Sequence, residues 1–320
     1  MMEGQQLPLF ERKGDQGAFG PPVARPEMTL TRDSSLAAIV GGFHDHMVRQ
    51  GYTENTIRAF LSDLRILTRY LGSGRAIGTI STKDLDDFLT YLRYYRGKPC
   101  SPKSYARRVT TLKALFSWLA EQEIIPRDPA APIPQEQASS PLPHILYADQ
   151  VQRLLNTTPR LMEDSEDPDP RPHMLVSLLL KTGIKKGEAM RIHLTHIDLS
   201  DPQGPALYIR YASPRQRHKE RKLRLPDDFA QTLAQYCNRY QPQERLFECT
   251  ARNLEYVLQD VAEQADLPQG VSFEMLRWTA AVQDYRAGMD PDKLRQKLGL
   301  SEITWRDTLR KIKMLAGPAL

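Results

Sequence analysis

The chain has 320 residues, 44 Lys and Arg against 39 Asp and Glu, a net charge of +5, and 40% hydrophobic residues, which is enough for more than one core. The modest basic excess permits a nucleic-acid partner without requiring one. The three cysteines form no CxxC pair and there is neither an apolar signal core nor a long uncharged run, so the sequence predicts no zinc site, cofactor, disulfide framework or membrane partner, and a cytosolic location.

The first 30 residues are rich in Gly, Pro and Gln and show no sustained hydrophobic periodicity. Such a composition predicts a flexible arm. Within it, Gln6, Leu7, Pro8, Leu9 and Phe10 form a compact apolar island.

Residues 31–130 have the spacing of helices and predict a small all-helical domain. Thr53 can cap one helix, Ser81 and Asp84 form a capping box for another, and Ser101 followed by proline marks the start of a third. The inner faces of these helices are apolar at spacings of three and four, as in Ile57, Phe60, Leu64, Leu67, Val109, Leu112, Leu115, Phe116 and Leu119.

Residues 131–145 belong to a proline-rich stretch that predicts an extended linker, because proline removes backbone donors and blocks helices. A second domain is predicted over residues 146–320. It contains helices near residues 174–181 and 186–192 and four more beyond residue 226. Two alternating apolar segments around residues 207–211 and 223–225 flank a polar turn and predict a β-hairpin.

Five segments together resemble the tyrosine recombinase (phage integrase) family over about residues 36–314. In the first domain they are GYTENTIRAFLSDL and SPKSYARRVTTLKALFSWLAEQEIIPRDPA. In the second domain KTGIKKGEAMRIHLTHIDL, VSFEMLRWTAA and AGMDPDKLRQKLGLSEIT follow in family order. The resemblance implies a mainly α fold with a small β-sheet: an N-terminal helical core-binding (SAM-like) domain and a tyrosine-recombinase catalytic-type domain.

The resemblance also implies which positions hold the reacting phosphate in the family. Its two arginines fall on Lys185 and Arg277, its two histidines on Glu274 and Leu300, and its nucleophilic tyrosine on Leu309. Lysine loses the bidentate fork of arginine, and leucine has no nucleophilic atom. No tyrosine follows residue 285. We therefore expect no intact catalytic residues and a protein that is not an enzyme, a pseudo-recombinase.

Two cationic surfaces are candidates for contact with double-stranded DNA. On the polar side of the helix that starts at residue 102 lie Lys103, Ser104, Arg107 and Arg108. In the hairpin turn lie Arg215, Arg217, Lys219 and Arg221, of which Lys219 best matches the family's catalytic lysine. Lys185 and Arg277 complete the expected DNA-binding set. A solvated charged turn, an Arg277–Glu188 ion pair and a helix N-terminal role for Glu274 are the alternatives.

Three functions remain open from the sequence. The leading expectation is a non-catalytic DNA-binding protein of the nucleoid with an architectural, regulatory or recombination-accessory role, acting with itself or another recombinase subunit. The first alternative is an active recombinase or integrase with a rearranged active site. The second is a protein-interaction module that kept the fold without binding DNA.

The apolar island of the arm resembles the QLxLF peptide with which bacterial replication and repair proteins dock on the sliding clamp. The resemblance assigns the contacts to Gln6, Leu7, Leu9 and Phe10. A glutamine amide and apolar anchors at fixed offsets suit a preformed hydrophobic pocket. The alternative is that these side chains fold back onto the helical domain.

Overall fold

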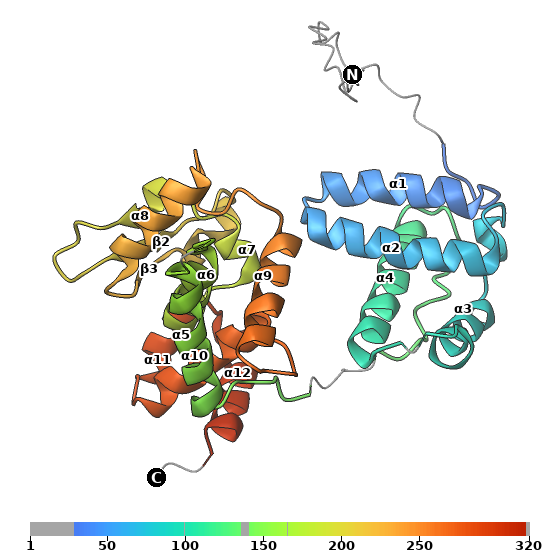
Figure 1. Cartoon of the computed structure of the whole chain (residues 1–320). Helices are drawn as coiled ribbons and strands as arrows, with labels where there is room; N and C mark the ends of the chain where they lie inside the picture. The colour runs from blue at the N-terminus through green and yellow to red at the C-terminus, as the bar shows by residue number, and fades with distance from the viewer. Residues whose placement is uncertain (1–28, 99, 136–140, 165, 318–320) are drawn as a thin grey trace, which may run out of the picture. The chain divides into compact units, whose positions relative to one another are not determined.

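The computed structural model describes residues 29–98, 100–135, 141–164 and 166–317. The chain divides into two units, residues 1–140 and 141–320 (Figure 1), and each contains its own hydrophobic core. Both units are mainly helical, and the described strands form one small sheet, as the sequence predicts. No helix in these described ranges is long and apolar enough to cross a membrane.

Unit 1 is a bundle of helices around a core that all of them share. A 3-10 turn over residues 77–79 follows the second helix, and a π-helical turn over residues 91–95 extends the third. The α-helices of the unit are α1 (Leu36–Arg49), α2 (Glu54–Leu71), α3 (Thr82–Thr90) and α4 (Pro102–Glu121).

Side-chain caps set the starts of these helices where the sequence predicts them. The hydroxyl of Thr53 accepts the backbone N–H of Thr56 at the start of α2, and Ser81 and Asp84 form the predicted capping box of α3. Ser101 caps α4, whose first residue is proline. Each cap satisfies a backbone donor that has no partner within its helix.

Unit 2 contains eight α-helices in its described residues together with the sheet. They are α5 (Ala148–Met162), α6 (Arg171–Thr182), α7 (Lys186–Ala189), α8 (Phe229–Tyr240), α9 (Ala251–Gln264), α10 (Phe273–Arg286), α11 (Pro291–Leu298) and α12 (Glu302–Ala316). The helix expected over residues 186–192 is a single turn, because the chain then bends and the Ile192 carbonyl accepts the Leu246 N–H at 2.8 Å.

The sheet confirms the predicted hairpin and adds a strand that the sequence did not predict. Strands β2 (Ala206–Ile209) and β3 (Arg221–Arg224) pair antiparallel, and β1 (Ile197–Asp198) pairs with the other edge of β2. A two-residue strand carries too little alternation to be recognised in the sequence. The hairpin turn contains a 3-10 helix over residues 214–219.

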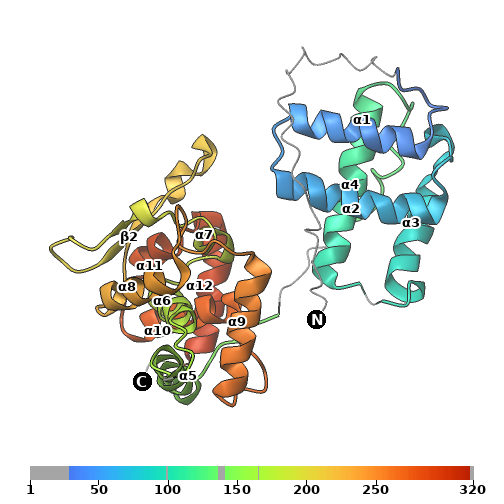
Figure 2. The same cartoon turned by 45° about the horizontal axis from the view of Figure 1, so that its top comes forward.

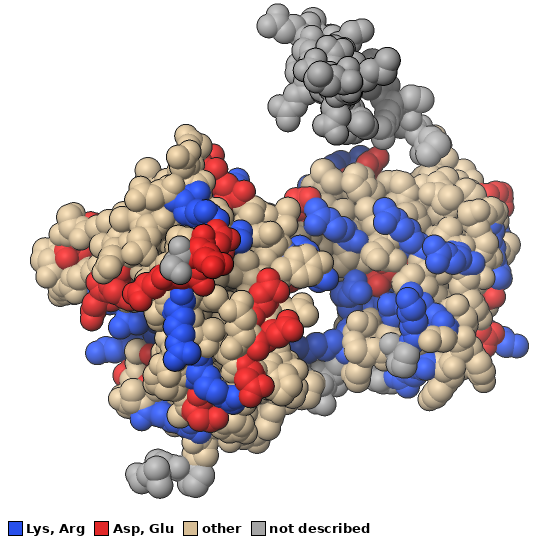
Figure 3. All heavy atoms as spheres, viewed as in Figure 1, with Lys and Arg blue, Asp and Glu red and all other residues tan. Residues whose placement is uncertain are grey.

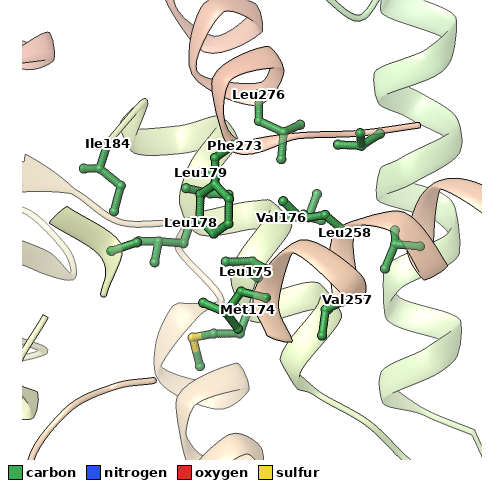
Figure 4. Packing of buried hydrophobic residues seen from close by; sticks show 14 of the residues in the cluster. Met174, Leu175, Val176, Leu178, Leu179, Ile184, Val257, Leu258, Phe273 and Leu276 are labelled. Atoms are coloured by element: carbon green, nitrogen blue, oxygen red, sulfur yellow. The ribbon is translucent and has the colours of Figure 1, made fainter. Parts of the chain in front are cut away.

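Helix α6 forms the centre of unit 2. It contacts α5, α8, α9, α10 and β3, and Figure 2 shows it end-on among α5, α8, α9 and α10. Its buried residues Met174, Leu175 and Leu178 pack with side chains from α9 and α10 such as Val257 and Leu276 (Figure 4). This apolar axis fixes where the C-terminal end of α6 lies.

At that end the chain makes a sharp turn at Gly183, which caps α6 with a left-handed φ of +60°. A side chain there would be strained by φ and would lie 3.2 Å from Leu298 on α11. The turn brings Lys185, the N-cap of α7, against α10.

Candidate functional site

A buried carboxylate organises a cluster of cations in unit 2. Glu188 of α7 accepts two hydrogen bonds from Arg221 of β3, at 3.1 and 3.0 Å, and one from the backbone N–H of Lys185 at 2.9 Å. The charges of Lys219 and Arg277 also act on Lys185. Charged side chains from α7 and its N-cap, from the hairpin and from α10 thus lie near one another.

Glu188 remains ionised despite its burial. Burial alone would raise its pKa, but the hydrogen bonds and charge of Arg221 and the hydrogen bond from Lys185 lower the pKa to about 2. The phenol of Tyr211 also donates to Glu188. Burial and this hydrogen bond raise the pKa of Tyr211 to about 12. The phenol is therefore held in its protonated form.

Lys185 and Arg277 lie near Glu188, but neither is fully neutralised by it. Burial lowers the pKa of Lys185, and the neighbouring positive charges lower it further against the opposing effect of Glu188. Burial, together with the charge of Arg221, lowers the pKa of Arg277 to about 10, although Glu188 opposes this. Arg277 donates to the carbonyls of Gly183 and Leu298, the latter at 2.7 Å. The expected alternative of an Arg277–Glu188 ion pair is wrong, because Arg221 takes the carboxylate.

Lys185 and Arg277 line an open pocket of about 920 Å³ between α7, α9 and the start of α10. Glu274 lines the same pocket from the first turn of α10, where it is exposed. This is the helix N-terminal position given above as an alternative for Glu274, and the dipole favours a carboxylate there. The pocket offers cationic donors of the kind that bind a phosphate.

The segment after α11 supports the cluster from behind. Gly299 has φ of +60°, and a Cβ on it would lie 2.6 Å from Nη1 of Arg221. Nε of Arg221 donates to the carbonyl of Lys297 at 2.6 Å. The Arg221 side chain therefore passes close to Gly299 on its way to Glu188, where a larger residue would crowd it.

Leu300 and Leu309 lie in an apolar cluster formed by α10, α11 and α12. Both are half-buried and contact this core, which includes the buried Trp305 and Ile312. Their packing explains why apolar side chains stand at positions where the resemblance placed a histidine and a tyrosine.

The hairpin turn divides into an exposed and a buried part. Arg217 is exposed and Lys219 is half-buried near Lys185, whereas the side chain of Arg215 lies outside the described structure. Arg221 does not face solvent as expected for a DNA contact, because its side chain is 8% exposed and paired with Glu188.

Helix α4 presents fewer charges than expected. Lys103 is exposed and Ser104 is half-buried at its start. Arg107 and Arg108 instead turn towards Asp63 of α2, at 2.8 and 3.3 Å, and Arg108 is buried. The expectation that Arg108 contacts DNA is therefore wrong, because a buried carboxylate requires cationic partners.

Asp63 is the residue of unit 1 that sequence reasoning missed. Burial raises its pKa, while Arg107 and Arg108 lower it. The signal was available, since Asp63 lies between Phe60 and Leu64 on the apolar face of α2. Gln6, Leu7, Leu9 and Phe10 lie outside the described residues, so the clamp-binding motif stays a prediction.

Two family models match the chain. The first, described as "Phage integrase, N-terminal SAM-like domain", matches residues 42–123. The second, described as "Phage integrase family", matches residues 144–305 and with them the cation cluster. The chain belongs to the phage integrase family. The predicted family, its SAM-like core-binding domain and its catalytic-type domain are thereby confirmed.

Tyrosine recombinases match this phage integrase family member over most of their length. Tyrosine recombinase XerC of Anoxybacillus flavithermus is 26% identical over 269 residues, 80% of this chain and 87% of that protein. Tyrosine recombinase XerD of Listeria innocua is 22% identical over 276 residues, 82% of this chain and 89% of that protein. These names point to an enzyme, and the expectation of a protein without catalytic function is wrong.

Solved structures show the same fold. A lambda integrase dimer bound to a COC′ core site superposes with a TM-score of 0.65 at 17% identity and covers 86% of this chain and 78% of the integrase. The Tn1549 transposon integrase in complex with a circular intermediate DNA gives a TM-score of 0.66 at 16% identity, covering 87% and 94%.

Proposed function

We propose that this chain is a DNA recombinase that holds a backbone phosphate of duplex DNA at the cluster of Lys185, Lys219 and Arg277. The observation that carries the proposal is an open pocket of about 920 Å³ that Lys185 and Arg277 line, with the charge of Lys219 acting on Lys185, within the family-matched region. Attack on a phosphodiester places negative charge on the non-bridging oxygens, and fixed cations stabilise that charge.

The proposed active site is rearranged relative to the tyrosine recombinase pattern. Because Leu309 packs in the apolar cluster of α12, the attacking hydroxyl must come from another group of this chain or from a second recombinase subunit. Tyr211 is close to the cations, but its phenol is held by Glu188 with a pKa of about 12. That contact suits a role in positioning Glu188 better than nucleophilic attack.

A suicide duplex tests this proposal, because a nick beside the scissile phosphate releases a short strand and traps any covalent intermediate. The full chain is incubated with the duplex, alone and with recombinases of its source organism. A protein–DNA adduct on a denaturing gel is expected, and peptide mapping of the adduct identifies the nucleophile. Lys185→Gln and Arg277→Gln should each reduce the adduct, whereas the exposed Lys313→Gln on α12 should not. No adduct under any of these conditions would contradict the catalytic proposal.

We further propose that Gln6, Leu7, Leu9 and Phe10 dock on a sliding clamp, as the resemblance of this segment suggests. A short peptide that orders on binding should have an affinity in the micromolar range, and Pro8 reduces the ordering cost. Fluorescence polarisation of a labelled peptide of residues 1–19 against the clamp measures this. Binding that persists unchanged in Leu9→Ala/Phe10→Ala would refute it.

A further inference from the structure

A second cationic pocket lies on unit 2, formed by the end of α6, strand β3 and helix α11. It has a volume of about 610 Å³, within the range of ligand-binding pockets. Its lining contains six cations and one carboxylate, Asp284. The cations are Lys181, Arg221, Lys222, Arg224, Lys293 and Lys297. Lys and Arg side chains are visible in the part of unit 2 that contains α11 (Figure 3).

Some of these charges are already paired within the protein. Lys297 contacts Asp284 at 2.6 Å, and Arg224 contacts Asp201 at 2.7 Å, a carboxylate that Lys222 also binds. Hydrogen bonds from both cations lower the pKa of Asp201. One carboxylate thus serves two cations, which leaves strand β3 with an excess of positive charge.

Among the six cations that line the pocket, Lys181 and Lys293 have no paired carboxylate in the described residues. Both are exposed, and neither has a carboxylate within 4.0 Å among the described residues. Including the partner carboxylates Asp201 and Glu188 on neighbouring elements, the six cations meet three acids. A concave surface with such an excess concentrates the positive potential and attracts a multivalent anion.

We propose that this pocket binds an anion carrying two or more linked phosphate groups. Flexible ammonium groups act as mobile point charges that can follow successive phosphates, while Leu223 and Met289 give the pocket an apolar floor. The source is either a free oligophosphate, such as the phosphate chain of a nucleotide, or the backbone of a DNA segment. This pocket shares no lining residue with the pocket that Lys185 and Arg277 line, so its occupant is separate from the phosphate of the proposed recombination site.

Isothermal titration of the full chain with sodium tripolyphosphate at low salt tests the proposal. Saturable binding is expected, and Lys181→Gln/Lys293→Gln should weaken it by roughly tenfold or more, since two charge-assisted contacts are lost. The matched control is Lys98→Gln/Lys313→Gln, which removes the same charge from two exposed lysines elsewhere and should leave the affinity unchanged.

Lys185→Gln separates this pocket from the recombination site. Tripolyphosphate binding that is lost in Lys185→Gln but kept in Lys181→Gln/Lys293→Gln would overturn the proposal, as would the absence of binding. A duplex titration distinguishes the two sources. If the occupant is the DNA backbone, Lys181→Gln/Lys293→Gln should bind duplex DNA more weakly than wild type. If the occupant is a free oligophosphate, the same variant should bind duplex DNA as wild type does and tripolyphosphate more weakly.

Discussion

The buried carboxylate of Glu188 holds Arg221 of the hairpin and the backbone of Lys185 beside the candidate site. Its side chain is 1% exposed and Arg221 pairs with it through two nitrogens. Buried ion pairs contribute little net stability, but the loss of one partner leaves an uncompensated charge and is costly. Removing Glu188 should therefore lower the free energy of unfolding by more than the net contribution of the Glu188–Arg221 ion pair.

Glu188→Gln should destabilise the protein at pH 7, and the difference from wild type should shrink in acid. The pKa in the folded state, about 2, lies below the ordinary value of 4.5. The ionised carboxylate therefore contributes stability that is present above pH 4.5 and is lost as pH falls towards 2. The contribution is about 3 kcal/mol from the size of the shift. Urea unfolding of both proteins between pH 7 and pH 2.5 measures it, and a constant difference across this range would contradict the assignment.

Tyr211→Phe removes the phenol that donates to Glu188 and keeps the ring. Loss of a hydrogen bond to a charged acceptor should cost roughly 1.5–3 kcal/mol of unfolding free energy. If Tyr211 only positions Glu188, the suicide-duplex adduct persists in this variant. Complete loss of the adduct from a folded Tyr211→Phe protein, together with a wild-type adduct that maps to Tyr211, would identify the phenol as the nucleophile.

At the scale of elements, the α2–α4 contact is both polar and apolar. The core of unit 1 surrounds Asp63, which accepts from Arg107, Arg108 and the hydroxyl of Thr111. Three donors from one helix on one carboxylate fix how the two helices lie against each other. This contact turns two of the cations of α4 inwards.

Arg108→Ala should therefore act on folding. Removing one partner of a buried pair should lower the unfolding free energy by about 3–5 kcal/mol, measured by urea denaturation followed by circular dichroism. Asp63→Leu/Arg108→Leu, which removes both charges, should be more stable than Arg108→Ala. Lys103→Ala, on the exposed start of α4, serves as a control and should leave stability unchanged. An Arg108→Ala protein of wild-type stability would show that the pair is dispensable.

Local signals predicted much of the fold. The caps at Thr53, Ser81 and Ser101 and the apolar spacing of the helices are properties of a few neighbouring residues, and they fixed α2, α3 and α4. Strand β1 and the short α7 depend on pairing with distant segments, such as the bond from Leu246 to Ile192. Neighbouring residues do not encode such pairing, which explains why β1 was missed and why α7 was predicted to be longer than it is.

The sequence singled out residues whose charges lie near one another in the structure, but it did not show how they pair. Lys185, Lys219 and Arg277 were singled out by family resemblance, and the structure brings their charges together. The choice of Arg221 as the partner of Glu188, and the phenol of Tyr211, follow from how the hairpin packs on α7. The spacing of residues in the sequence cannot show which of several cations pairs with a given carboxylate.

At the scale of the whole molecule, each unit has its own core and its own cationic residues. Figure 3 shows many Lys and Arg side chains on the visible face of unit 1, with few carboxylates among them. Contacts between such surfaces and phosphates release counterions, so affinity for DNA should fall steeply with salt.

The slope of log affinity against log salt should decrease by roughly 0.9 for each lost phosphate contact. Lys103→Gln, Lys185→Gln and Lys219→Gln should each reduce the slope by about this amount in mobility-shift titrations at several salt concentrations. Lys313→Gln serves as the control. Slopes that are equal in all four variants and in wild type would place the DNA on another surface.

Gly299 limits what can be engineered into this protein. Its left-handed φ strains any other residue, and a Cβ would lie 2.6 Å from the Arg221 guanidinium, which would have to move. A saturation library at this codon should therefore retain mainly glycine under selection for folding. Any chimera that imports the C-terminal segment of a related recombinase must keep a glycine at this position, since otherwise Arg221 is displaced and Glu188 is left without its counter-charge.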